Sequence, residues 1–179
     1  MRIYLLLLTL GFVSVAAVAQ KDYPYVDDVG FIVKTGQQAP DFKIEYANGD
    51  PSVKLSDLRG NVVLLQFTAS WCGVCREEMP HLEKRIWQRF KDKHFYLIGI
   101  DRKEPLKKVK TFSEIMKISY PLAMDIDEQI YTLYAHPKSG VTRNVLIDKS
   151  GKIVFLTRLF KEDEFNILIK KIEEELGKQ

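Results

Sequence analysis

The sequence predicts an α/β domain, a central sheet with helices on both of its faces. Residues 62–67 are apolar apart from Gln66, as in a strand that is covered on both sides. A second strand pattern spans residues 95–101. Apolar side chains between 165 and 176 recur at the spacing of one helix face, and three acidic residues, 162–164, stand at the start of that helix. Strands of this kind need helical layers on the sheet, so the patterns together indicate α/β architecture.

The other elements follow in chain order. Asn48-Gly49-Asp50 is typical of a hairpin turn, and residues 55–60 of a short helical turn before the central strand. A helix is expected from about Cys72 to Phe90, kinked by Pro80 because proline removes one backbone hydrogen bond. The remaining expected elements are an amphipathic helix opened by Pro105, a strand at 120–125, a helix at 130–134, and strands at 145–147 and 153–156.

The N-terminus has the pattern of a cleaved signal peptide. Arg2 provides a positive start, residues 3–18 are almost entirely apolar, and Ala17-Val18-Ala19 is a cleavage motif. The alternative is an uncleaved membrane anchor, but the apolar run is shorter than the roughly 20 residues that a span prefers. Such a signal peptide would direct export, and cleavage after Ala19 would leave the mature protein in an oxidising, periplasm-like compartment.

The expected organisation is therefore a signal peptide at 1–19, an N-terminal extension at 20–35 and one domain at 36–179. A chain of 179 residues is long enough for one domain with a substantial core. The formal net charge of +3 is too small to indicate nucleic-acid binding, and no basic stripe interleaved with aromatic residues occurs. Oligomeric state is not indicated.

Both cysteines of the chain lie in one motif, Cys72-Gly73-Val74-Cys75, between the strand at 62–67 and the following helix. At a helix N-terminus, free N–H groups and the helix dipole favour an anion, and such a position lowers a thiol pKa from about 8.5 towards 7 or below. A zinc site would need about two more ligands, and the three histidines show no paired spacing. A structural disulfide would close so short a loop that it would constrain little chain. The pattern therefore predicts a redox dithiol.

This stretch, from the strand through Trp71-Cys72-x-x-Cys75 to Glu78-Met79-Pro80, resembles the thioredoxin fold, and within it the TlpA/ResA branch of exported thiol–disulfide oxidoreductases. Residues 36–42, a glycine followed by Ala-Pro-Asp-Phe, are similar to the entry motif of that family. The resemblance covers roughly residues 36–177. It implies a mixed sheet of thioredoxin type, with the strand–helix piece at 120–134 as the insertion of this branch.

The resemblance also implies roles. Cys72 would attack a substrate disulfide, Cys75 would resolve the mixed disulfide, and Glu78 would modulate thiol ionisation. Glu78 lies three residues after Cys75, close to the same side of the helix, whereas Glu77 is expected to face water. Trp71 would shield the dithiol, and no cofactor or metal is needed. The implied partners are a disulfide-bearing protein substrate and a membrane thiol–disulfide electron donor.

Two positions depart from the family pattern. Gln66 stands where thioredoxins bury an aspartate, and it is expected to be a hydrogen-bonded core amide. Thr142 stands where the family has a cis-proline facing the dithiol, beside Val141, whose peptide groups would pair with a substrate strand. A cis bond before a non-proline residue costs about 2.5–4 kcal/mol, so a trans Val141–Thr142 bond is expected. Arg143 is either a cation that stabilises the Cys72 thiolate or a surface arginine.

Three functions remain open at this stage. Protein-disulfide reduction is favoured, because Gly73-Val74 supplies no histidine to stabilise a thiolate strongly and so argues against a powerful oxidant. Peroxide reduction is the second, but Leu65 and Ala69 stand where peroxiredoxins carry proline and threonine. The third is a non-enzymatic, redox-sensitive module, or a metal or iron–sulfur protein made possible by Thr142 in place of proline.

Overall fold

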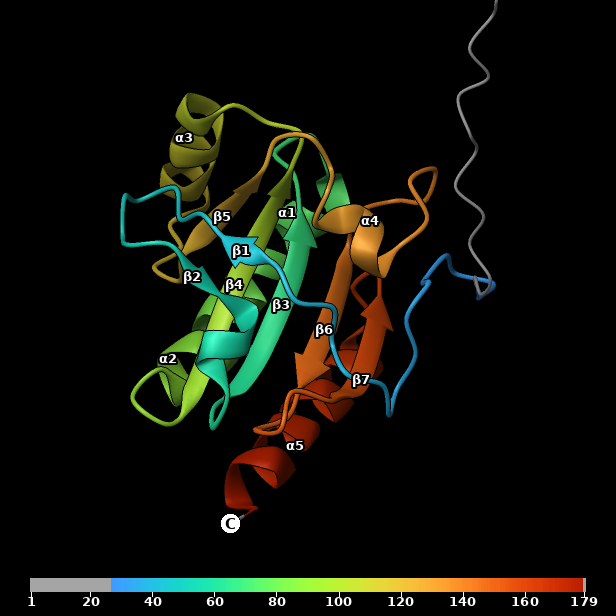
Figure 1. Cartoon of the computed structure of the whole chain (residues 1–179). Helices are drawn as coiled ribbons and strands as arrows, with labels where there is room; N and C mark the ends of the chain where they lie inside the picture. The colour runs from blue at the N-terminus through green and yellow to red at the C-terminus, as the bar shows by residue number, and fades with distance from the viewer. Residues whose placement is uncertain (1–26, 179) are drawn as a thin grey trace, which may run out of the picture.

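A five-stranded mixed sheet forms the centre of the molecule in a computed structural model that describes residues 27–178 (Figure 1). The strand order is β5-β4-β3-β6-β7, and a separate two-stranded sheet pairs β1 with β2. The strands are β1 (Lys43–Ile44), β2 (Val53–Lys54), β3 (Val62–Thr68), β4 (Phe95–Arg102), β5 (Leu122–Asp125), β6 (Arg143–Ile147) and β7 (Ile153–Arg158).

The direction of the strands decides which chain ends meet. β3 runs parallel to β4 and antiparallel to β6, with Phe67 opposite Arg143. The carboxyl end of β3 and the start of β6 therefore lie at the same edge of the sheet, the upper edge in Figure 1. The dithiol motif follows β3, and Thr142 immediately precedes β6.

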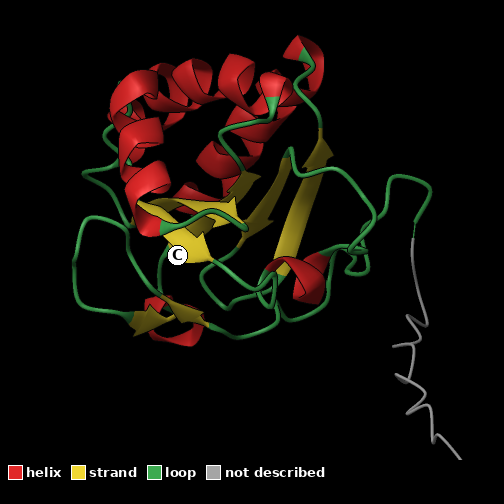
Figure 2. Cartoon of the chain, turned by 90° about the horizontal axis from the view of Figure 1, so that it is seen from above, coloured by secondary structure: helices red, strands yellow, loops and turns green. Residues whose placement is uncertain are grey.

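Helices cover the two faces of the sheet unequally, as the view from above shows (Figure 2). The long helices share one apolar cluster, built on Leu64 and Leu97 of the sheet. The other face is covered by the single turn of α4, the 3-10 turn η1 and the chain before β1, around Phe67 and Ile100. The helices are η1 (Leu55–Leu58), α1 (Gly73–His81), η2 (Leu82–Trp87), α2 (Gln88–Phe90), α3 (Leu106–Met116), α4 (Tyr131–Tyr134) and α5 (Glu162–Gly177).

The expected active-site helix is present as one helical run in three parts. α1 continues into the π-helical η2 two residues after Pro80, and α2 completes the run. Proline lacks the N–H that continues the α ladder, so a change of helix type beside it has a local cause. Leu82, Ile86 and Phe90 are buried along this run, as their spacing predicts. Pro105 is the N-cap of α3 rather than its first helical residue.

Part of the N-terminal extension packs on the domain. Phe31 and Val33 are buried, and Phe31 forms a bridge with Ala135. Residues 27–35 thus contribute to the core on the α4 side. The signal peptide expected at 1–19, its cleavage point and the start of the extension lie outside the described residues. Within residues 27–178 no helix is long and apolar enough to cross a membrane.

Candidate functional site

The two cysteines stand at the start of α1 and are joined in a disulfide. Cys72 is the N-cap of this helix, and its Sγ accepts a hydrogen bond from the Cys75 N–H at 3.2 Å. Cys72 is partly exposed, whereas Cys75 is fully buried. A helix-terminal N–H directed at one sulfur stabilises negative charge on that sulfur. The geometry therefore favours Cys72 as the accessible thiolate once the disulfide is reduced.

Thr142 approaches both sulfurs from the start of β6. Its Oγ1 lies 3.0 Å from Cys72 Sγ and 3.1 Å from Cys75 Sγ, and the residue is buried. Since disulfide sulfurs carry no proton, the hydroxyl donates in the oxidised state. No cis peptide bond occurs between residues 27 and 178, which confirms the expectation of a trans Val141–Thr142 bond.

The surface next to the dithiol combines an exposed ring with free peptide groups. Trp71 is 60% exposed and directly precedes Cys72. The Val141 side chain is buried, while its N–H and C=O have no hydrogen-bond partner within the described chain. An extended peptide laid along Val141 could pair with these groups, as strands add to a free edge.

Glu78 is buried one turn after Cys75 and held by two amide side chains. Gln66 Nε2 donates to Oε2 at 3.0 Å, and Asn144 Nδ2 donates to Oε1 at 2.6 Å. Burial raises the pKa of Glu78 to about 7, although both hydrogen bonds favour the ionised form. The Tyr120 hydroxyl donates to Gln66 Oε1 at 2.8 Å, so Gln66 is the satisfied core amide that the sequence predicted. The side chain of Glu77 is exposed, also as expected.

This network has room for one more proton. Asn144 Oδ1 is buried and has no hydrogen-bond partner among the described residues. If the Asn144 amide turns by half a rotation, Oδ1 faces Glu78 and can accept a hydrogen bond from the O–H of its neutral carboxyl group. The site can therefore stabilise either protonation state of Glu78, which suits a group with a pKa near neutrality.

A second acidic pair lies at the same edge of the sheet. Glu104 accepts hydrogen bonds from the Ser70 N–H at 2.6 Å and the Ser70 hydroxyl at 2.8 Å, just before the dithiol motif. Lys108 forms an ion pair with Glu104 at 2.5 Å. Asp101, at the end of β4, is fully buried, and burial with the nearby Glu104 charge raises its pKa to about 8. Glu104 thus holds the turn that leads into Trp71 and Cys72.

Of the two roles expected for Arg143, the structure excludes the surface arginine, and stabilisation of the Cys72 thiolate stays a prediction. It is fully buried, so it is not a surface arginine. Its guanidinium donates to the Gly140 carbonyl at 3.0 Å and to the Val29 carbonyl at 2.5 Å, and lies over the Phe31 ring. These partners lie in the loop before Thr142 and in the N-terminal extension. Arg143 therefore connects these two segments, and none of its hydrogen bonds is to a sulfur.

Three residues of the network were not identified from the sequence. Asn144 lies 66 positions from Glu78, Tyr120 lies 54 positions from Gln66, and Glu104 lies 34 positions from Ser70. A weak signal existed for Asn144, a polar residue beside the apolar run 145–147. It is the register partner of Gln66, which is likewise polar in an apolar strand.

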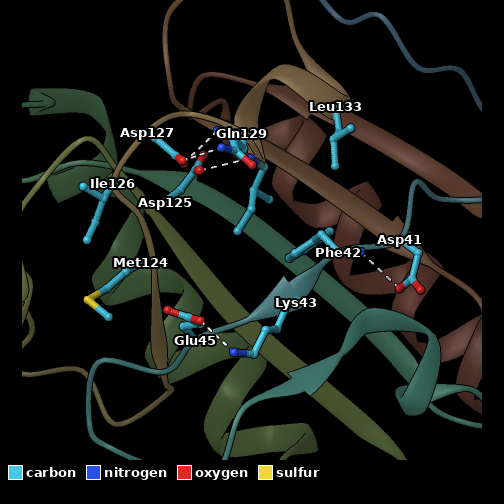
Figure 3. Close-up of a pocket in the computed structure, with 11 residues that line it drawn as sticks. Asp41, Phe42, Lys43, Glu45, Met124, Asp125, Ile126, Asp127, Gln129 and Leu133 are labelled. Atoms are coloured by element: carbon cyan, nitrogen blue, oxygen red, sulfur yellow. Dashed lines mark hydrogen bonds and ion pairs between the residues drawn. The ribbon is translucent and has the colours of Figure 1, made fainter.

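A well-defined groove lies away from the dithiol. It encloses about 550 Å³ between the chain around β1 and the segment from β5 to α4, and none of its lining residues belongs to the dithiol motif (Figure 3). Phe42 and Leu133 provide apolar walls, and carboxylates such as Asp127 stand at its rim. This groove is therefore separate from the dithiol.

Two further features bear on the peroxide-reduction and metal-binding alternatives. Leu65 and Ala69 have apolar side chains and are both fully buried, so neither offers a hydrogen-bonding group beside Cys72. Among residues 27–178, no group of three or more histidine, cysteine or acidic side chains is arranged to hold a metal ion.

Comparison with known proteins gives consistent sequence matches. The AhpC/TSA family profile matches residues 35–156. The thiol-disulfide oxidoreductase ResA of Bacillus cereus is 31% identical over 122 residues, which cover 68% of each chain. ResA of Bacillus subtilis is 30% identical over 122 residues, 68% of this chain and 66% of that protein.

Solved structures agree with these matches. A Bacteroides thetaiotaomicron protein, provisionally described as a protein disulfide isomerase, is 54% identical, with a TM-score of 0.81 over 84% of this chain and 94% of that one. A Chlorobium tepidum protein, provisionally described as the thiol:disulfide interchange protein DsbE, is 30% identical. Its TM-score is 0.71, over 81% of this chain and 99% of that one. The thioredoxin-like fold and the resemblance to ResA are confirmed: this chain is an oxidoreductase that belongs to the AhpC/TSA family and to the ResA-like thiol–disulfide oxidoreductases.

Proposed function

We propose that the protein reduces disulfide bonds in other proteins outside the cytoplasm. One observation carries the division of labour: Cys72 is partly exposed and accepts a helix-terminal N–H, while Cys75 is fully buried behind it. A nucleophile must reach its substrate, and a resolving thiol needs only to reach the nucleophile.

The reaction proceeds in two exchanges that balance. The Cys72 thiolate attacks one sulfur of the substrate disulfide, forms a mixed disulfide and releases the other substrate sulfur as a thiolate. Cys75 loses its proton and attacks Cys72 Sγ, which closes the Cys72–Cys75 disulfide and releases the second substrate thiol. The substrate gains two electrons and two protons. A membrane thiol–disulfide donor then returns the electrons to the dithiol.

Residues around the dithiol are proposed to support this chemistry. Glu78, with a pKa near neutrality, exchanges the proton that Cys75 must lose. The Thr142 hydroxyl donates to the Cys72 thiolate from its position 3.0 Å away. Trp71 and the free peptide groups of Val141 hold the substrate strand beside the dithiol.

Export is part of the proposal and rests on the signal-peptide pattern at residues 1–19. Cleavage after Ala19 predicts that the protein recovered from the cell envelope begins at Gln20. N-terminal sequencing of that protein checks the prediction, and a mature chain that begins at Met1 would contradict it.

The first site prediction separates the two cysteines. Cys72→Ala is expected to abolish reduction of a peptide disulfide, whereas Cys75→Ser should accumulate the mixed disulfide because nothing resolves it. Non-reducing gel electrophoresis and mass spectrometry measure the adduct. The proposal fails if Cys72→Ala still reduces disulfides, or if alkylation of the reduced protein labels Cys75 before Cys72.

The second prediction concerns the Thr142 hydroxyl. Thr142→Val keeps the shape of the side chain but removes the donor, so the Cys72 thiolate loses a hydrogen bond. A bond to a charged group is worth about 1.5 kcal/mol, so the Cys72 pKa should rise by about one unit. The rate of iodoacetamide alkylation against pH measures this pKa, and Thr142→Ser, which keeps a hydroxyl, is the control.

The third prediction concerns Glu78 in the oxidised protein, where the cysteines do not titrate. Its folded pKa of about 7 exceeds the ordinary value of 4.5, so the folded state keeps a proton that the unfolded state has lost. The resulting stability is fully present below about pH 4.5 and is lost as pH rises through 7. The free energy of unfolding falls by no more than about 1.4 kcal/mol per pH unit over this range.

Glu78→Gln should remove this slope from the free energy of unfolding, measured in urea from pH 4 to 8. Glu77→Gln, at an exposed position, is the control and should leave the slope unchanged. Asp101, whose pKa is raised to about 8, contributes a slope of the same sign in all three proteins. Identical slopes in the wild type and in Glu78→Gln would show that Glu78 ionises normally.

A further inference from the structure

The loop that carries Thr142 to the dithiol has no regular secondary structure of its own. Residues 136–142 connect α4 to β6 and include Gly140. Yet the Thr142 hydroxyl lies within 3.1 Å of two sulfurs, and a hydrogen bond of this kind weakens steeply once its geometry is lost. Something outside the loop must therefore hold it in place.

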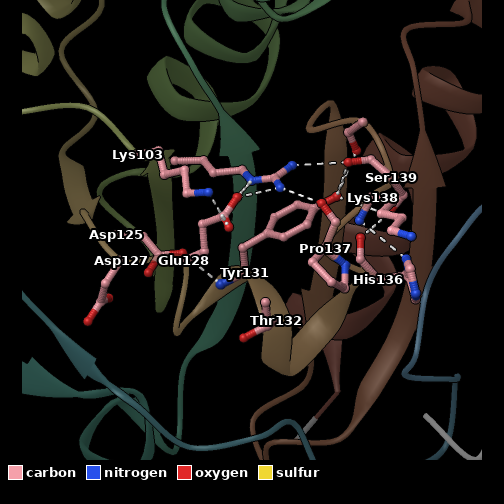
Figure 4. Close-up of polar contacts among 12 residues, drawn as sticks. Lys103, Asp125, Asp127, Glu128, Tyr131, Thr132, His136, Pro137, Lys138 and Ser139 are labelled. Atoms are coloured by element: carbon pink, nitrogen blue, oxygen red, sulfur yellow. Dashed lines mark hydrogen bonds and ion pairs between the residues drawn. The ribbon is translucent and has the colours of Figure 1, made fainter. Parts of the chain in front are cut away.

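Arg102, at the end of β4, binds the loop through its backbone carbonyls. Its Nη1 donates to the Ser139 carbonyl at 3.0 Å and its Nη2 to the Pro137 carbonyl at 2.6 Å. Figure 4 shows Pro137 and Ser139 on one side of these contacts and Glu128 on the other. Glu128 fixes the guanidinium from the other side by accepting from Nε at 2.6 Å. Only about a tenth of the Arg102 side chain is exposed, so water competes weakly for these bonds.

Tyr131, in α4, holds the next part of the same loop. Its hydroxyl lies 2.9 Å from the Ser139 carbonyl and 2.9 Å from the Gly140 carbonyl, two residues before Thr142. Its ring packs under the Arg102 guanidinium at 3.9 Å and edge-to-face with Phe67 of β3. Asp125 accepts the Tyr131 N–H at 2.7 Å and so fixes the start of α4.

We propose that Arg102 and Tyr131 are positioning residues for the dithiol, which hold the carbonyls of residues 137–140 so that the Thr142 hydroxyl stays on Cys72. The inference rests on the proposed role of Thr142 and extends it to two residues that touch neither sulfur. Both residues act on backbone carbonyls of the loop, alongside Arg143 of β6, whose Nε donates to the Gly140 carbonyl at 3.0 Å.

Tyr131→Phe tests the proposal with a matched control on the same helix. Tyr134 is equally buried, and its hydroxyl donates at 2.7 Å to the carbonyl of Pro40, away from the Thr142 loop. Each phenylalanine variant loses one buried hydroxyl and keeps its ring. A general loss of stability should therefore affect both variants. Loss of Thr142 positioning should change the Cys72 pKa in Tyr131→Phe alone.

The measurement is the pKa of Cys72 in the reduced protein, obtained from alkylation rate against pH. Tyr131→Phe should raise it, so that alkylation near neutral pH slows about threefold, which corresponds to half a pKa unit. Tyr134→Phe should alkylate as the wild type does. Arg102→Lys keeps the positive charge but loses the planar fork that spans two carbonyls, and should shift the pKa in the same direction as Tyr131→Phe.

A double variant shows whether the effect passes through Thr142. Tyr131→Phe in the Thr142→Val background should cause no further change, because the hydroxyl being positioned is already absent. The proposal is overturned by an additive shift, by a wild-type pKa in both Tyr131→Phe and Arg102→Lys, or by an equal shift in Tyr134→Phe. Each of these results leaves the disulfide-reductase proposal standing, since that depends on the inactivity of Cys72→Ala.

Discussion

The antiparallel pairing of β3 with β6 is the constraint on which the rest of the site depends. β3 delivers the dithiol motif at its carboxyl end, and β6 begins at the same edge because it runs in the opposite direction. The register that sets Phe67 opposite Arg143 brings Thr142 to Cys72, although 70 positions separate them in the chain. A shift of this register by one residue would turn each side chain of β6 to the other face of the sheet. It would move Asn144 away from Glu78 and separate the two halves of the site.

The same pairing explains how a carboxyl group can be buried behind the dithiol. Gln66 and Asn144 are register partners on adjacent strands, and each donates one amide hydrogen to Glu78. An ionised carboxylate in an apolar interior would otherwise carry a desolvation penalty of several kcal/mol. The two amides offset part of this cost, and the remaining part raises the pKa to about 7. An uncharged glutamine at position 66 suits this arrangement, since a second carboxylate there would repel Glu78.

The two faces of the sheet make different contributions. The face covered by α1, α3 and α5 is an apolar layer, with the buried part of the active-site helix packed into it. The opposite face carries aromatic residues of α4 and of the N-terminal extension, together with the arginines that bind the loop before Thr142. Arg102 reaches that loop from β4, and Arg143 reaches it from β6. The face with fewer helices thus holds the loop before Thr142.

The local elements were determined by the sequence alone. Apolar runs and helical spacing identified the strands, the helices and the motif Cys72-x-x-Cys75, because such patterns record burial and capping within a few residues. The trans bond before Thr142 was also predictable, from the intrinsic cost of a cis peptide. Only the tertiary structure decided the partners of Glu78, the burial of Arg143 and the anchoring of the Thr142 loop by Arg102 and Tyr131. These depend on strand register and on contacts across tens of residues, where a single polar side chain has the same local pattern whether it faces solvent or a buried partner.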